Sequence, residues 1–391
     1  MKYPTYKLSE VARSTKGKKP KSVSKEKTDG FEIPYVDIKA FEKGIVDNYT
    51  DGENCTFCKP DDVLIVWDGA RCGFVGRGVE GAIGSTLAKI SSDKYTNDFL
   101  FYFLQSKYKV LNSNPRGVGI PHIEPNLLWN FEIPDVDKTT QRAIVTRIET
   151  LFAELDKAVQ HLRTAQQQLK TYRQAVLNHW LNNDDGKWEM VKLGEVLQKI
   201  EAGKSFRCNE KVPALHEKGI VKISAVTWGE FMEDECKTII NEDLYNPQFA
   251  IHKGDLLISR ANTIQLVGNC VLVRKEPKRN IMLSDKVLRL VIRDNVDSDF
   301  ILYSLRTSKS RTQIQNMSTG NQDSMRNIGQ DRIKKIEIPL PPLTEQQHIV
   351  AEIERRLSQA TASETYIENA LQQAEALRQS ILKKAFSGEL V

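Results

Sequence analysis

Two small groups of residues have types and spacings that can support chemistry. Cys55 and Cys58 form a C-x-x-C pair, which is half of the ligand set of a zinc ribbon. No second pair follows in the sequence, and the remaining cysteines stand singly: Cys72, Cys208, Cys236 and Cys270. Two ordinary thiols near a turn are therefore the better interpretation. Glu235-Cys236-Lys237 has the E-x-K form of some nuclease sites, but a triplet this short is expected by chance.

The common catalytic motifs are absent from the sequence. The chain has no G-x-x-x-x-G-K-[ST] phosphate loop, no G-x-G-x-x-G dinucleotide turn and no H-E-x-x-H pair among its six histidines. The sequence therefore predicts no catalytic residue, no metal and no cofactor in this chain.

Polar loops of another kind occur twice. They combine Arg, Asn, Gln, Ser and Gly between predicted strands, and such side chains donate hydrogen bonds to phosphates and base edges. The first pair of loops is Asp68-Gly69-Ala70-Arg71 and Asn114-Pro115-Arg116-Gly117, and the second pair is 259–263 and 318–327. For any single loop, an ordinary polar turn is the better explanation. Both loop types recur after corresponding landmarks with different residues, however, which favours two nucleic-acid readers with different preferences.

Individual residues of these loops can be assigned contacts with DNA. Arg71 and Arg260 can each donate two hydrogen bonds to guanine, and Asn262, Asn321 or Gln322 can pair with adenine. The other predicted contacts are all cations, and those that hold phosphates make binding salt-dependent: Lys18, Lys19, Lys21, Arg116, Lys204, Arg207 and Arg326. The formal net charge of +5, from 56 basic and 51 acidic residues, permits a polyanionic partner without demanding one.

These loops lie in a chain that repeats itself. Residues 141–181 align without a gap with residues 346–386, whose numbers are 205 higher throughout. Glu132-Ile133-Pro134 and Glu337-Ile338-Pro339 keep the same offset just upstream. A repeat of this kind is the signature of a duplicated structural unit. The predicted order is globule, long helix, globule, long helix.

Each copy of the repeat is predicted to form one long helix. Apolar residues recur at alternating spacings of four and three, which places a single stripe along a helix and is typical of a coiled-coil seam. The predicted seam residues are Ile144, Ile148, Leu151, Leu155, Leu162 and Leu169 in the first copy, and Ile349, Ile353, Ile367, Leu377 and Ile381 in the second. At 1.5 Å per residue, each helix is about 60 Å long. A stripe of that length needs a partner, and the other copy is the nearest match.

The chain order favours antiparallel pairing of the two helices, because the first runs directly into the second globule and the second begins where that globule stops. The predicted fold class is α+β: two mixed α/β globules joined by two long antiparallel coiled-coil helices, with an internal pseudo-twofold repeat and the shape of a dumbbell. The predicted boundaries are 1–140 and 184–343 for the globules, and 141–183 and 344–391 for the helices.

The composition indicates a soluble protein. Hydrophobic residues make up 40% of the chain and charged residues 27%, which is the balance of a globular protein. No apolar run approaches the roughly 18 residues that a membrane span needs. Six cysteines in so long a chain fit reduced thiols better than a disulfide framework. We therefore expect a cytoplasmic protein that does not enter a membrane.

Three stretches of sequence carry a resemblance to a known family. The longest is Ile338-Pro339-Leu340-Pro341-Pro342-Leu343-Thr344-Glu345-Gln346-Gln347, and the others are Leu382-Lys383-Lys384-Ala385-Phe386-Ser387-Gly388-Glu389-Leu390 and Gly254-Asp255-Leu256-Leu257-Ile258-Ser259-Arg260. On these residues the whole chain resembles the specificity subunit of a Type I restriction–modification enzyme. It departs from the family's pattern in the first copy, where residues 134–140 replace the proline-rich start of the helix.

The resemblance implies two target recognition domains, each reading one half of a bipartite site in double-stranded DNA. It also implies that the helices set the gap between the half-sites and dock two modification subunits, which methylate adenine with S-adenosylmethionine. Restriction subunits, which translocate and cut DNA, are further partners that the resemblance allows. The chain itself is then a non-catalytic recognition subunit that binds no cofactor.

Two functions from other classes remain open on the sequence alone. One is a free-standing site-specific nuclease, which would cut DNA in the presence of Mg²⁺. The other is a coiled-coil scaffold with no role in DNA binding, which salt-sensitive and sequence-selective binding to DNA would exclude.

Overall fold

The chain forms two compact units, and each contains one globule and part of both long helices. The computed structural model describes residues 3–117 and 119–390. The first unit combines Met1–Arg163 with Ile367–Val391, and the second is Thr164–Tyr366. The first unit therefore draws its core from two distant parts of the sequence. No helix in the described ranges is both long enough and apolar enough to span a membrane.

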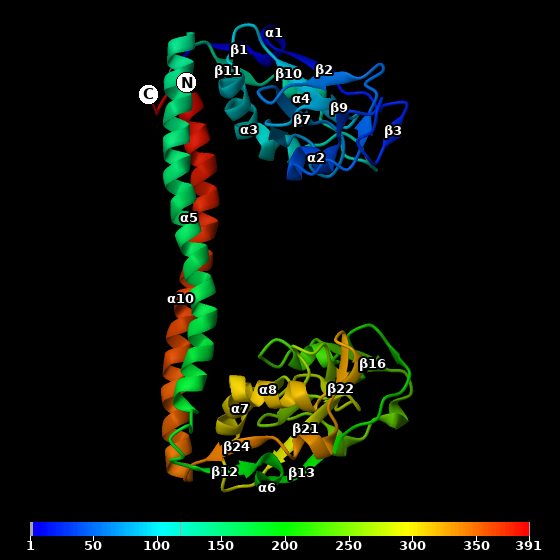
Figure 1. Ribbon diagram of the computed structural model, residues 1–391, viewed down its shortest axis with the longest axis vertical. Coiled ribbons are helices and arrows are strands. Elements are labelled where there is room, and N and C mark those ends of the chain that lie inside the picture. The colour runs from blue at the N-terminus through cyan, green and yellow to red at the C-terminus, as the bar shows by residue number, and fades with distance from the viewer. Residues whose placement is uncertain (1–2, 118, 391) are drawn as a thin grey trace. The chain divides into compact units, whose positions relative to one another are not determined.

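The two long helices are α5 (Lys138–Trp180) and α10 (Leu343–Ser387), with 43 and 45 residues (Figure 1). Neither contains Gly or Pro, so no residue breaks the backbone hydrogen bonds of the helix. Asp137 caps the start of α5, where its carboxylate accepts a hydrogen bond from the Thr140 amide at 2.7 Å. Gly388 follows α10 with a φ of 85°, a conformation that glycine adopts without strain and that commonly ends a helix.

In the first unit, the beginning of α5 packs against the end of α10. Ile144 and Ile148 are almost fully buried in one apolar cluster with Ile381. Farther along α5, Leu155 lines a small cavity of about 340 Å³ together with Leu371. Residue numbers rise along α5 while they fall along α10, so the two segments run antiparallel.

In the second unit, the end of α5 packs against the beginning of α10. Val176 and Leu177 are buried in one cluster with Ile349 and Ile353. Arg173, earlier in α5, lies 2.9 Å from the carboxylate of Glu364, later in α10. The predicted antiparallel pairing is therefore confirmed within each unit.

Most of the predicted seam residues are covered, but Leu377 is not. Ile144, Ile148, Ile349, Ile353, Ile367 and Ile381 are buried, and Leu151, Leu155, Leu162 and Leu169 are half-buried. The assignment of Leu377 to the seam is wrong, because its side chain is 50% exposed. The neighbouring Arg378 turns inward instead: its guanidinium lies 4.2 Å from the centre of the Phe152 ring and pairs with Asp156. A cation over an aromatic ring with a carboxylate partner thus takes the place of an apolar contact.

The first globule is a mixed α/β domain, and its described residues form three sheets, in the strand orders β1-β11, β2-β10-β7-β8 and β3-β5-β4-β9-β6. The strands are β1 (Thr5–Lys7), β2 (Arg13–Lys16), β3 (Val23–Ser24), β4 (Ile33–Val36), β5 (Tyr49–Thr50), β6 (Thr56–Cys58), β7 (Val63–Val66), β8 (Val75–Gly76), β9 (Gly81–Ile83), β10 (Leu87–Ser91) and β11 (Glu132–Pro134). The helices are α1 (Leu8–Val11), α2 (Ile38–Lys43), α3 (Asn97–Ser113) and α4 (Pro125–Trp129). Helix α3 buries Phe99 and Phe103 in the same cluster as the strand β7.

The second globule is also mixed α/β, with four sheets in the strand orders β12-β24, β13-β21-β17-β19, β14-β16-β15-β20 and β18-β23-β22. The strands are β12 (Glu189–Lys192), β13 (Leu197–Ala202), β14 (Cys208–Asn209), β15 (Lys218–Val221), β16 (Cys236–Ile239), β17 (Leu256–Ser259), β18 (Ala261–Asn262), β19 (Cys270–Leu272), β20 (Asn280–Met282), β21 (Val287–Ile292), β22 (Thr319–Gln322), β23 (Met325–Asn327) and β24 (Glu337–Leu340). The helices are α6 (Leu193–Val196), α7 (Ser298–Arg306), α8 (Ser308–Met317) and α9 (Gln330–Ile333), with 3-10 turns η1 (Ile223–Val226), η2 (Glu242–Leu244) and η3 (Pro247–Phe249).

The two globules share their central architecture. The sheet β2-β10-β7-β8 corresponds strand for strand to β13-β21-β17-β19, and both are antiparallel throughout. The pair β1-β11 corresponds to β12-β24, and each pair leads into a long helix. The predicted α+β class with an internal repeat is thus confirmed.

A polar joint ties each globule to its long helix. In the first unit, Glu149 of α5 accepts a hydrogen bond from the Tyr102 hydroxyl at 3.3 Å and lies 3.7 Å from the guanidinium of Arg77. The equivalent residues in the second unit are Tyr303, Arg274 and Glu354, with both contacts at 3.5 Å. The same three side-chain types recur, so the joint belongs to the repeated framework.

A buried glutamine lies near the start of each long helix. The side-chain oxygen of Gln141 accepts a hydrogen bond from the Thr96 amide at 2.9 Å, and that of Gln346 accepts one from the Asp297 amide, also at 2.9 Å. Both side chains are almost completely inaccessible to solvent. A buried amide without partners costs about 1–3 kcal/mol, so these bonds hold α3 and α7 at a defined place beside the helices.

Replacing Ile148 with Ala tests the seam of the first unit. The side chain is fully buried, so truncation leaves a cavity and is expected to lower the free energy of unfolding by about 2–5 kcal/mol. Leu377→Ala, in the same unit, removes a half-exposed side chain and should change it by less than about 0.5 kcal/mol. Urea unfolding followed by circular dichroism measures both. Equal losses in the two variants would contradict this placement of the seam.

Candidate nucleic-acid interface

A glycine-lysine turn follows the first strand of each of the two corresponding sheets, β2-β10-β7-β8 and β13-β21-β17-β19. Strand β2 leads into Gly17-Lys18, and β13 leads into Gly203-Lys204. A Cβ atom on Gly17 would lie 2.2 Å from the carbonyl oxygen of Gly84, and one on Gly203 would lie 1.9 Å from that of Leu283. No other residue fits at these distances. The two lysines are therefore placed at equivalent points of the two globules.

The cations of these turns face solvent. Four of them are exposed and have no ion-pair partner among the residues that the structure describes: Lys18, Lys19, Lys204 and Arg207. Lys21 lies 3.3 Å from the carboxylate of Glu53, in a pair exposed on both sides. Such a surface pair contributes little to stability, so Lys21 can exchange its partner at small cost. All five side chains are exposed to solvent, which the predicted phosphate contacts require.

A second turn follows β7 in the first globule and β17 in the second. A helix of the same globule holds each turn by hydrogen bonds, α3 in the first and α8 in the second. In the first globule, the side-chain amide of Asn112 donates to the carbonyl of Ala70 at 3.0 Å. In the second globule, the guanidinium of Arg311 donates to the carbonyl of Val267 at 2.8 Å. Because this side chain is largely buried, the pKa of Arg311 is lowered.

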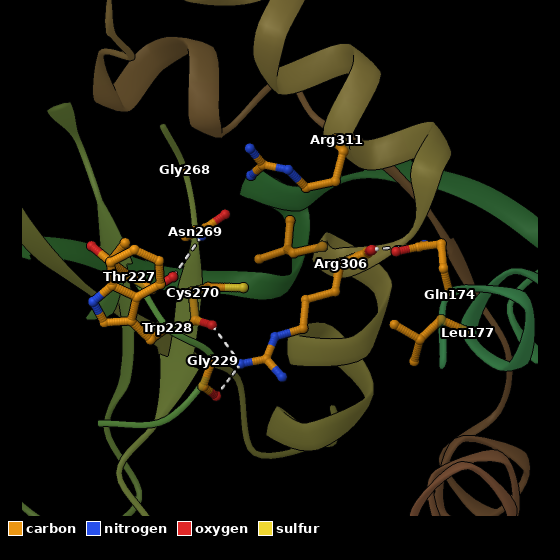
Figure 2. A pocket seen from close by; sticks show the side chains of 11 residues that line it. Gln174, Leu177, Thr227, Trp228, Gly229, Gly268, Asn269, Cys270, Arg306 and Arg311 are labelled. Atoms are coloured by element: carbon orange, nitrogen blue, oxygen red, sulfur yellow. Dashed lines mark hydrogen bonds between the residues drawn. The ribbon is translucent and has the colours of Figure 1, made fainter. Parts of the chain in front are cut away.

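Arg306 of α7 holds the strand β19 of the second globule by a hydrogen bond (Figure 2). Its guanidinium donates to the carbonyls of Gly229 and Cys270 at 2.6 and 2.8 Å, and its own carbonyl accepts a hydrogen bond from Gln174 of α5 at 3.2 Å. These residues line a cavity of about 440 Å³, with the exposed ring of Trp228 at its rim. The guanidinium of Arg306 is already hydrogen-bonded to backbone carbonyls of the same globule. We therefore interpret the cavity as the place where the loops meet α5.

A short hairpin is the third structural element of each globule that carries predicted DNA contacts, after the two turns. In the second globule, β22 pairs with β23, and β23 pairs with β18 in the turn after β17. The first globule has the same arrangement as isolated bridges: Arg116 pairs with His122, and His122 pairs with Asp68. The hairpin thus crosses the second turn in both globules.

Hydrogen bonds and ion pairs connect the three elements. In the first globule, the carboxylate of Asp68 lies 2.6 Å from Nδ1 of His122 and 2.9 Å from Nζ of Lys16, just before the glycine-lysine turn. In the second globule, the glycine-lysine turn and the second turn both bond to the segment just before β21: the amide of Gly203 donates to the carbonyl of Ser284 at 3.2 Å, and that of Arg260 donates to the carbonyl of Lys286 at 2.8 Å. The carbonyl of Arg260 also accepts a hydrogen bond from the amide of Ile328, just after the hairpin, at 2.9 Å. Each globule therefore presents one surface built from three loops. We call it the loop surface: residues 17–21, 68–72, 116–117 and 119–122 in the first globule, and 203–207, 260–267 and 319–327 in the second.

All the residues predicted to contact DNA lie on these two loop surfaces, but they are not equally available. Arg116, Arg260, Asn321 and Gln322 are exposed. Arg71 is engaged by the fold, since its guanidinium pairs with Glu42 at 2.8 Å and lies over the Phe74 ring.

Asn262 and Arg326 are also engaged within the second globule. The amide of Asn262 donates to the hydroxyl of Thr227 at 3.3 Å and accepts from the Thr263 backbone at 2.8 Å. The guanidinium of Arg326 donates to the carbonyls of Ser318 and Gly320 at 3.0 and 3.1 Å, which clamps the two strands of the hairpin. These side chains hold the loops, and we do not include them among the residues proposed to read bases.

Sequence reasoning missed several residues that position the loop surfaces. His122, Arg306 and Arg311 belong to no motif, so no local signal points to them. The sequence does point to Gly73 and Gly268, because a glycine follows the strand β7 in the first globule and the corresponding strand β17 in the second. A Cβ atom on either would lie 2.6 Å from a side-chain atom of the helix behind, Leu111 or Ile314.

The cysteines and the E-x-K triplet have ordinary surroundings. Burial raises the pKa of the Cys58 thiol to about 11, which disfavours the thiolate that zinc binds. No cluster of three or more His, Cys, Asp or Glu side chains in the described ranges is arranged to hold a metal ion. Glu235 accepts a hydrogen bond from the Ser224 hydroxyl at 2.5 Å, and Lys237 pairs with Glu210 at 2.6 Å.

Comparison with known proteins identifies the family. The model of the Type I restriction modification DNA specificity domain matches residues 2–162 and 185–373, which include both loop surfaces. The chain belongs to this family. The resemblance inferred from the proline-rich helix start and the C-terminal segment is therefore confirmed.

Relatives in this family match most of the chain. The specificity subunit of the Type I restriction enzyme MjaVIII, from Methanocaldococcus jannaschii, is 27% identical over 361 residues, which cover 87% of this chain and 82% of that protein. The specificity subunit of EcoKI, from Escherichia coli K12, is 26% identical over 352 residues, which cover 85% of this chain and 75% of that protein.

Solved structures show the same fold. One chain, from a study of complex assembly and conformational transition of the type I R-M system, has a TM-score of 0.73 with 22% identity and full coverage of both chains. The HsdS subunit from Thermoanaerobacter tengcongensis has a TM-score of 0.57 with 22% identity, and 99% of this chain matches 97% of that one.

Replacing Lys204 with Ala tests the contact between the glycine-lysine turn and phosphate. We expect weaker DNA binding and a slope of log K against log salt that is less steep by about 0.9, the value for one lost phosphate contact. Lys278→Ala is the matched control, because this exposed lysine precedes β20 and lies outside the loop surface. Fluorescence anisotropy at several salt concentrations measures both slopes. If the slope for Lys204→Ala equals the wild-type slope, this contact is ruled out.

Proposed function

We propose that this chain is the DNA specificity subunit of a Type I restriction–modification system, in which each globule reads one half of a bipartite site. The observation that carries the proposal is the loop surface, which the chain builds twice. Both copies use the same strands, the same glycine-lysine turn and the same hairpin, but they present different side chains. Two readers on one repeated framework are suited to two different half-sites in double-stranded DNA.

The helices α5 and α10 are proposed to set the gap between the half-sites. Each helix is continuous over more than 40 residues and contributes to the cores of both units. A stiff connection of this kind keeps the number of base pairs between two recognition events constant. A flexible linker would permit many gaps.

The chain is further proposed to act without catalytic residues of its own. On this hypothesis, two modification subunits dock on the long helices and methylate adenine with S-adenosylmethionine, and restriction subunits join them to cut DNA in the cytoplasm. The family match and the duplicated loop surface favour this recognition role over a free-standing nuclease or a scaffold without DNA.

Mapping adenine methylation tests the proposed function directly. Cells that express this chain with its modification subunits should carry methylated adenines in one bipartite motif, and cells that lack the chain should not. Single-molecule sequencing of genomic DNA from both strains reports the motif and its gap together. Methylation that is identical in the two strains would refute the proposal.

Shortening the helices tests the spacer role. Deleting one heptad from each helix, near Arg163 in α5 and near Tyr366 in α10, removes about 10 Å of helix and keeps the apolar stripe in phase. We expect the same two half-sites with a gap up to about 3 base pairs shorter, because base pairs are about 3.4 Å apart. A methylated motif with the original gap would show that other parts of the assembly set the spacing.

A further inference from the structure

Two exposed apolar side chains lie at equivalent points of the two hairpins. Ile120 is 65% exposed and Met325 is 69% exposed. Each stands two residues before the residue that pairs with the start of its hairpin: His122, which pairs with Arg116 in the first globule, and Asn327, which pairs with Thr319 in the second. Met325 also pairs with Gln322. A single exposed apolar residue is common on a protein surface and needs no explanation. The same placement in two hairpins of different length and sequence does need one.

The backbone of each hairpin is built around this residue. Gly117 and Gly320 directly follow the first pairing residue, and both have positive φ, at 98° and 146°. A Cβ atom on Gly117 would lie 3.1 Å from the carbonyl oxygen of Ile120, and one on Gly320 would lie 2.3 Å from that of Met325. In both globules a glycine therefore packs against the backbone of the exposed apolar residue and defines its position.

Each hairpin also exposes at least one polar side chain. Asn321 and Gln322 are exposed on the same hairpin as Met325, and Arg116 is exposed on the hairpin of Ile120. Neither apolar side chain is covered by another part of its own globule. A thioether or an alkyl group has no charge with which to hold a phosphate, so the partner that fits is an apolar group framed by polar ones.

We propose that Ile120 and Met325 are base-contacting residues, one for each half-site, and that each hairpin carries its apolar side chain into the major groove. This inference rests on the proposed function. The major groove admits a two-stranded β-ribbon and exposes base edges that include the methyl group of thymine, an apolar surface framed by hydrogen-bonding groups. Such contacts discriminate between base pairs, so these residues help to determine sequence preference as well as affinity.

The experiment compares Ile120→Ala with Met325→Ala in the full chain, purified with its modification subunits. Three DNA duplexes are compared. One carries the intact bipartite motif identified by the methylation experiment, and each of the others has one half of that motif scrambled. Each variant should lower the preference for one intact half by about tenfold, the size expected for one lost base contact. Preference for the other half should stay at the wild-type value, and the two variants should affect different halves. Each variant is thus the matched control for the other.

Two further variants separate contact from folding. Met325→Leu keeps a side chain of similar volume and should retain most of the preference. Leu215→Ala removes another exposed apolar side chain of the second globule, 61% exposed and outside the loop surface, and should change neither half. The melting temperature should stay constant in all variants, because each replaced side chain is exposed.

Several outcomes would overturn the inference while the proposed function stands. These are wild-type preference in both variants, a loss confined to the same half in both, or an equal loss of affinity for intact and scrambled duplexes, which would indicate contact with the backbone. A wild-type chain that prefers no bipartite duplex would instead overturn the proposed function.

Discussion

The packing of the end of α10 into the first globule is the interaction on which the first unit depends. The ring of Phe386 meets those of Phe99 and Phe103 edge to face, with centroids 5.2 and 5.4 Å apart, and Leu382 is fully buried beside them. Aromatic and aliphatic burial of this kind dominates core stability. Because α10 comes far later in the sequence than the helix α3 on which it packs, the first unit closes only when both parts of the chain are present. The globule and its two helix segments form one folding unit for this reason.

This packing also explains how the loop surfaces are supported. The joints built on Glu149 and Glu354, and the buried amides of Gln141 and Gln346, tie α3 and α7 to the long helices. The same helical regions hold the turn after the central strand, through Asn112 in the first globule and through α7 and α8 in the second. Support therefore passes from the apolar seam through the helix behind each sheet to the loops. The framework recurs between the globules while the loop side chains differ, and such a division lets recognition change without loss of the fold.

The sequence predicted the repeated elements well and the chemistry of single side chains poorly. The alternating spacing of apolar residues located both long helices, because that periodicity reflects burial along a whole face. It misplaced Leu377, since periodicity does not register that Arg378 can cover an aromatic ring and pair with a carboxylate. It grouped Asn262 and Arg326 with Asn321 and Gln322, because residue type alone does not show which polar groups the fold already satisfies. Ile120 and Met325 drew no attention, since an apolar residue in a sequence is expected to be buried.

What the sequence determined by itself is the architecture: a duplicated unit, two long helices with one apolar stripe each, and antiparallel pairing of those stripes. These features follow from periodicity and chain order, which are properties of the sequence. What only the tertiary structure decided is the assignment of roles on the loop surfaces. Whether an arginine clamps a hairpin or faces solvent, and whether a methionine is buried or exposed, depends on hydrogen bonds and contacts between residues far apart in the chain. The physical reason is that burial and hydrogen-bond satisfaction are set by the whole set of neighbours in space, which no local pattern specifies.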